Sequence, residues 1–163
     1  MDDLICEIRS LLELGYEGGY WDFKSDYPDK NKKEDKLHDI ICMANNLEDR
    51  DAYLIYGAND DGTIKGIQNT EKQRLKTADF IKFLRDKNFA GGFIPDIKLQ
   101  TIVIDNNELD ILIIRRGKHT PYYLQKDYYE SSPKEKLRAG AIYTRTADIN
   151  TPKECTACLL YTS

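Results

Sequence analysis

Residues 17–24, Glu-Gly-Gly-Tyr-Trp-Asp-Phe-Lys, are the feature that most constrains the fold of this 163-residue chain. From Trp21 to Lys24, bulky apolar side chains alternate with charged ones, and this alternation predicts a strand. Side chains two residues apart lie on the same face of a strand, so we expect Asp22 and Lys24 to lie together. The strand therefore carries a carboxylate and an ammonium group to one side of a sheet.

A second segment ends an apolar run in a turn rich in glycine and aspartate. Residues 52–56 predict a buried strand, and residues 57–62, Gly-Ala-Asn-Asp-Asp-Gly, predict the turn. We expect carboxylates of the two segments, from the set Glu17, Asp22, Asp60 and Asp61, to converge near Lys24. Carboxylates hold Mg²⁺ or Mn²⁺, and such metals cut phosphodiesters. The two segments therefore predict a site for Mg²⁺ or Mn²⁺ built from three or four of these carboxylates.

Each of these residues also has an ordinary interpretation, which the residues alone leave open. Glu17 can be a surface carboxylate, and Asp22 and Lys24 can form a weak ion pair on one strand face. Asp60 and Asp61 can serve only to form a turn, because aspartate favours turns. The turn also lacks the lysine and hydroxyl of a phosphate-binding P-loop, so ATP binding has little support.

The composition is that of one globular domain. Hydrophobic residues make up 40% of the chain, and the 24 basic and 28 acidic residues give a net charge of −4. This balance argues against a protein coated in positive charge, but it leaves room for a local basic groove. No apolar run approaches the roughly 20 residues that span a bilayer, and the N-terminus is acidic, so we expect a cytoplasmic protein without membrane contact.

Local patterns predict an α+β fold with a mixed, largely antiparallel sheet and flanking helices. Apolar residues recur at helical spacing over residues 2–14, 34–46 and 70–87, the last with Thr70 as cap. Strands are expected at 21–24, 52–57, 63–67, 97–104, 109–115 and 141–145. Residues 1–153 are expected to form the domain, and we interpret residues 154–163 as an unstructured tail left by expression design or sequence assembly.

Laid out in order, residues 8 to 153 resemble the Schlafen-type AlbA domain, a nucleic-acid-binding module, in a bacterial-type member. The shared motifs are an apolar helix, a glutamate and a strand ending in an acid, phenylalanine and lysine; then Ala-Asn at a helix end, an apolar strand with an Asp-rich turn, Pro-Tyr-Tyr-Leu, and a closing strand ending in arginine. In this chain they are Leu11-Leu12, Glu17, Asp22-Phe23-Lys24, Ala44-Asn45-Asn46, residues 53–62 with Ile64-Lys65-Gly66-Ile67, Pro121 to Leu124, and Ile142 to Arg145 with Asn150-Thr151-Pro152.

The resemblance implies a metal-dependent endoribonuclease that acts on structured RNA, especially transfer RNA. The three acidic catalytic residues then match Glu17, Asp22 and Asp60. The resemblance implies that these three coordinate Mg²⁺ or Mn²⁺, with Asp61 as a possible helper, and we expect Lys24 to stabilise negative charge on the phosphate. Asp22 stands where the family usually has glutamate, so its carboxylate reaches one methylene less far. The loop at residues 48–51, Glu-Asp-Arg-Asp, replaces the usual pair of glycines.

Nucleic-acid contacts are expected from basic and aromatic side chains in the second half of the chain. Arg115, Arg116, Lys118 and Arg145 are predicted to hold phosphates. Tyr122 and Tyr143 are predicted to stack on unpaired bases, although such tyrosines more often pack at the edge of a core.

The expected partner is structured RNA or single-stranded nucleic acid. Because one such domain offers few phosphate contacts, we expect a two-fold homodimer with the four basic residues lining a shared groove. Further domains are expected in the native protein. The alternative function is a non-catalytic DNA-binding regulatory or interaction domain of a larger transcriptional regulator or ATPase-like protein.

Overall fold

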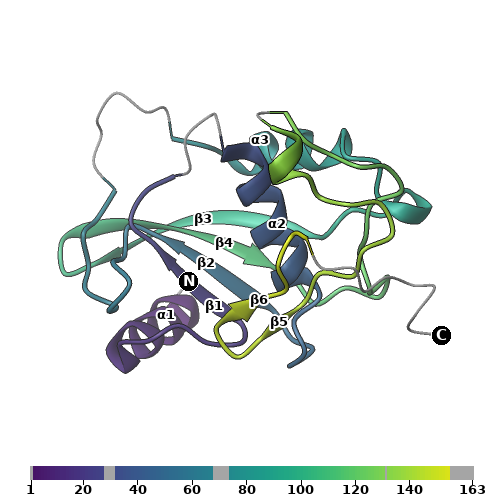
Figure 1. Ribbon diagram of the computed structural model, residues 1–163. Coiled ribbons are helices and arrows are strands. Elements are labelled where there is room, and N and C mark those ends of the chain that lie inside the picture. The colour runs from purple at the N-terminus through teal and green to yellow at the C-terminus, as the bar shows by residue number, and fades with distance from the viewer. Residues whose placement is uncertain (1, 28–31, 68–73, 131, 155–163) are drawn as a thin grey trace.

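The computed structural model describes residues 2–27, 32–67, 74–130 and 132–154 (Figure 1). Its helices are α1 (Asp2–Leu14), α2 (Lys33–Ala44) and α3 (Thr77–Arg85), with short 3₁₀ turns at Ala90–Gly92 and Pro133–Glu135. The main sheet contains β1 (Trp21–Lys24), β2 (Ala52–Tyr56), β3 (Ile97–Ile104) and β4 (Asn107–Ile114), and β5 (Arg145–Thr146) pairs with β6 (Ile149–Asn150) in a separate small hairpin.

The main sheet is mixed, with strand order β1-β2-β4-β3. β1 and β2 run parallel, which requires a crossover, and α2 supplies it. β4 pairs antiparallel with both β2 and β3. A tight turn joins β3 to β4, and its two central residues, Asp105 and Asn106, have φ values of 51° and 63°. This is the left-handed geometry of the commonest two-residue hairpin turn. The α+β class with a largely antiparallel sheet is confirmed.

Helices cover both faces of the sheet, and this explains why β2 is apolar without alternation. Ala52, Leu54 and Tyr56 pack in the core that α2 and α3 close, whereas Tyr53 and Ile55 pack in the core that α1 closes. A strand buried on both faces has no polar side. Figure 1 shows α1 and α2 on opposite sides of the sheet.

Three predicted elements differ in the structure. The third helix begins at Thr77 and not at residue 70, because Lys76 is extended and the Asp79 carboxylate accepts from its backbone N–H at 2.8 Å. The predicted cap Thr70 lies outside the described residues. The predicted strand at 63–67 is reduced to one bridge between Ala58 and Ile64.

At the C-terminal end, the predicted strand at 141–145 is wrong, because regular pairing begins only at Arg145 and turns back at once through Ala147, whose φ is 53°. Most of the predicted tail, residues 155–163, lies outside the described residues.

Candidate nucleic-acid interface

The predicted pair Asp22 and Lys24 does lie on one face of β1. The Lys24 ammonium is 3.0 Å from the Asp22 carboxylate, and it is also 3.0 Å from Asp39 on α2. Asp22 is 6% exposed, and its second oxygen accepts from the Arg145 guanidinium at 3.2 Å. These four side chains form the buried ionic cluster, in which two carboxylates face two cations.

The charges of this cluster depend on one another. Burial disfavours the Lys24 cation, but Asp39 and Asp22 outweigh burial and raise the pKa of Lys24 above its ordinary value. Burial raises the pKa of Asp39, against the opposing effect of Lys24. Lys24 is therefore charged and already held between two carboxylates.

Arg145 lies inside the protein and not on a surface that phosphates can reach. It is 3% exposed, and its guanidinium donates to the carbonyl oxygens of Gly18 at 3.0 Å and Trp21 at 3.2 Å. A third nitrogen donates to the Asn150 amide oxygen at 3.0 Å. Its bonds to Gly18, Trp21 and Asp22 join the β5–β6 hairpin to the start of β1, and its bond to Asn150 lies within the hairpin.

The structure does not gather the predicted metal ligands. Glu17 is half-buried and accepts from the Phe23 backbone N–H at 3.3 Å, and Asp60 is exposed on the turn after β2. Across the residues that the structure describes, no three His, Cys, Asp or Glu side chains are placed to hold one metal ion. With Asp22 already paired to two cations, this donor set does not fit Mg²⁺ or Mn²⁺ as it stands.

Three of the exposed cations lie close together on the loop that follows β4, residues 115–118, which we call the basic loop. Arg115, Arg116 and Lys118 are all exposed. The Arg116 guanidinium binds both carboxylate oxygens of Asp49, at 3.0 and 2.9 Å, and its backbone N–H donates to Asp51 at 2.7 Å. The acidic loop at 48–51 thus holds the basic loop in place.

Gly117 lets the basic loop lie directly on a buried tyrosine. A Cβ at Gly117 would be 2.0 Å from the Tyr122 hydroxyl oxygen, so only glycine fits there without movement. Tyr122 is 4% exposed and Tyr143 is 1% exposed. Neither ring therefore offers a face on which a base could stack. Tyr122 instead supports the basic loop at Gly117.

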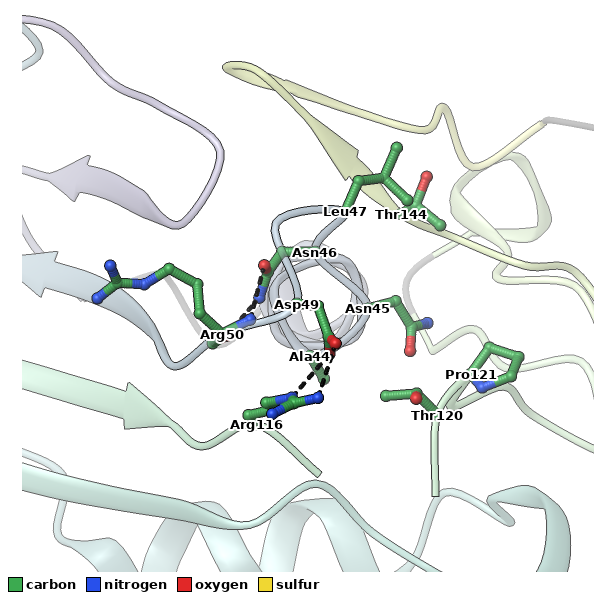
Figure 2. Close-up of a pocket in the computed structure, with 10 residues that line it drawn as sticks. All are labelled: Ala44, Asn45, Asn46, Leu47, Asp49, Arg50, Arg116, Thr120, Pro121 and Thr144. Atoms are coloured by element: carbon green, nitrogen blue, oxygen red, sulfur yellow. Dashed lines mark hydrogen bonds and ion pairs between the residues drawn. The ribbon is translucent and has the colours of Figure 1, made fainter. Parts of the chain in front are cut away.

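Two neighbouring hollows lie between the basic loop and the C-terminal end of α2. One, of about 310 Å³, is drawn in Figure 2, where Arg116 and Asp49 meet at one side and Arg50 points away. Arg50 instead pairs with Glu7 at 2.9 Å. The second, of about 570 Å³, shares three lining residues with the first and adds Gly117 and Lys118. The shared residues are Asp49, Arg116 and Thr120.

Asn45, from the Ala-Asn motif, fixes the floor of this region. Its amide nitrogen donates to the carbonyl oxygens of Tyr122 at 2.8 Å and Tyr143 at 2.9 Å, and its oxygen accepts from the Tyr122 N–H at 2.8 Å. Three bonds from one buried side chain therefore join the end of α2 to two distant segments. These hydrogen bonds give Asn45 of the Ala-Asn motif a structural role.

One exposed aromatic pair near the basic loop escaped the sequence analysis. The rings of Phe93 and His119 are stacked, with centroids 3.6 Å apart and planes 6° apart, and Phe93 is 47% exposed. The one sequence feature near this pair was Gly91-Gly92 before Phe93, and from local sequence it predicts only the end of a helix.

The family model described as Schlafen, AlbA_2 matches residues 17–154, so the chain belongs to the Schlafen AlbA_2 family. The family indicates a nucleic-acid-related domain. No curated protein matches the sequence closely enough to count as a relative.

Among solved structures, the chain is similar to the DIP2311 protein from Corynebacterium diphtheriae, with a TM-score of 0.51 and 18% sequence identity. The match covers 93% of this chain and 26% of that protein, so it supports the fold alone. None of the described helices is long and apolar enough to cross a membrane.

Proposed function

We propose that this domain binds nucleic acid through the basic loop, with RNA or single-stranded nucleic acid as its ligand. The observation that carries the proposal is the exposure of Arg115, Arg116 and Lys118 on one short loop beside the two hollows. Family membership supports the same role.

The electrostatics of the loop suit phosphate groups better than the net charge of −4 suggests. Within the described residues, no acidic side chain pairs with Arg115 or Lys118, whereas Arg116 is engaged by Asp49. Free cations attract phosphates and release counterions, so binding is expected to weaken as salt rises. Two available cations on this loop predict modest affinity.

Endoribonuclease activity, which the family resemblance implies in addition to nucleic-acid binding, stays a prediction. Transfer RNA cleavage with Mn²⁺ tests it, with Glu17→Ala and Asp60→Ala as the informative variants. Asp22→Ala is less useful, because removing that carboxylate disturbs the buried ionic cluster.

The binding proposal is tested by fluorescence anisotropy with labelled transfer RNA and a labelled single strand at low salt. The double variant Arg115→Gln, Lys118→Gln removes both available cations of the loop. Its matched control is Lys82→Gln, Arg85→Gln, which removes two exposed cations from α3. We expect affinity to fall about tenfold in the first and little in the second. Absence of binding by the wild type, or equal loss in both double variants, contradicts the proposal.

A further inference from the structure

The rings of Phe93 and His119 stack on each other at the surface. The other four phenylalanines of the chain are buried or half-buried. Phe93 is 47% exposed, and His119 is exposed as well. The pair is also placed next to charge, because His119 directly follows Lys118 of the basic loop.

Backbone hydrogen bonds hold the two segments that carry these rings side by side. On one side of the pair, the Arg115 N–H donates to the Asp96 carbonyl at 2.8 Å, which extends the β3–β4 ladder. On the other side, the Ala90 N–H donates to the Tyr123 carbonyl at 2.9 Å. The two rings therefore lie between two backbone hydrogen bonds that hold their segments together, and such rigid support is what a binding platform requires.

The glycine pair before Phe93 sets the direction of its ring. Gly91 and Gly92 have φ values of 72° and 74°, which favour glycine. A Cβ at Gly91 would lie 3.1 Å from the Phe93 ring, so the backbone there approaches the ring closely. This local geometry turns Phe93 outward onto His119, where it contributes little to the core.

We propose that an unpaired base stacks on the Phe93–His119 pair while the basic loop holds the neighbouring phosphates, so that the domain selects single-stranded over double-stranded nucleic acid. Bases in a duplex are already stacked on one another, whereas unpaired bases offer their faces to aromatic side chains. This inference rests on the proposed function, since it places the base beside the phosphate contacts made by Lys118 and Arg115.

Fluorescence anisotropy with a single strand of about 15 nucleotides and a blunt duplex of equal length tests the inference. The variants are Phe93→Leu and His119→Leu, with His119→Phe to restore a ring. Tyr129→Leu is the matched control, because Tyr129 is an exposed aromatic, 48% exposed, on another loop. Circular dichroism melting of each variant shows that it is folded. A 2-aminopurine base in the single strand reports stacking directly, because its fluorescence falls when it stacks.

We expect the single strand to bind more tightly than the duplex, and Phe93→Leu and His119→Leu to weaken it about tenfold while losing the fluorescence decrease. His119→Phe and Tyr129→Leu are expected to bind like the wild type. Equal binding of both ligands, unaffected by the leucine variants, overturns this inference and leaves the proposed function standing. Failure of any nucleic acid to bind at low salt overturns both.

Discussion

At the scale of single residues, Arg145 and Arg115 differ sharply, one as a buried structural group and the other as an exposed candidate contact. Arg145 donates to two backbone carbonyls and to Asp22 within the core, whereas Arg115 is exposed and follows β4. Burying a charge is tolerated only when partners compensate it. The same residue type therefore has opposite consequences when it is replaced at these two positions.

Arg145→Met is expected to destabilise the fold by about 3–5 kcal/mol, because it leaves the buried Asp22 carboxylate with Lys24 alone and removes the guanidinium bonds to Gly18, Trp21 and Asn150. Urea unfolding followed by circular dichroism measures this difference. Arg115→Gln serves as the control and should change stability by less than about 0.5 kcal/mol. Wild-type stability in Arg145→Met would show that the cluster is dispensable.

Asp49→Asn is expected to raise affinity for nucleic acid a few-fold at low salt. The substitution releases the exposed Arg116 guanidinium from its ion pair, and such surface pairs are worth about 0–1 kcal/mol. Asp3→Asn on α1 removes the same formal charge from another exposed site and is expected to have a smaller effect. The same gain in both variants would mean that only net charge matters.

At the scale of elements, a buried carboxylate on β4 ties neighbouring segments to the sheet. Asp110 is 1% exposed and accepts from the Tyr27 hydroxyl at 2.5 Å, from Thr101 on β3 at 2.6 Å and from Arg74 at 3.1 Å. Burial opposes the charged form, but the hydrogen bonds from Arg74, Thr101 and Tyr27 outweigh it and lower the pKa of Asp110 below its ordinary value of 3.8.

The sign of the resulting pH dependence follows from that lowered pKa. The folded state binds the Asp110 proton less readily than the unfolded chain, so this stabilisation is complete above the ordinary pKa and disappears as pH falls through the lowered one. We expect the free energy of unfolding to fall as the pH drops below about 4, and Asp110→Asn to flatten that slope. Urea titrations at a series of pH values measure the wild type and Asp110→Asn. Equal pH dependence in the two proteins would contradict the role given to Asp110.

Local periodicity predicted the elements well where the pattern was strong. The alternation in β1 and the apolar run of β2 both predicted strands, and Asp22 and Lys24 do share a face. What local sequence could not predict was which polar groups are buried. Arg145 has the sequence context of an exposed strand end, and its burial depends on Gly18, which lies 127 residues earlier. Phe93 and His119 likewise meet only through tertiary pairing.

At the scale of the whole molecule, the charge is unevenly distributed. The chain has a net charge of −4, yet its basic loop carries three exposed cations within four residues. The expected two-fold dimer stays a prediction, but Arg145 cannot line its groove in this structure because it is buried. Light scattering with RNA present tests the dimer, and a particle near the monomer mass of 18.9 kDa would contradict it.

The dependence of nucleic-acid affinity on salt tests the central claim most directly, because the slope of log Kd against log salt concentration counts the phosphates that the protein neutralises. For the wild type we expect weaker binding at every increase in salt. The double variant Arg115→Gln, Lys118→Gln should reduce that slope by about two, one for each cation removed. An unchanged slope in this variant, or wild-type affinity that does not respond to salt, would contradict binding through the basic loop.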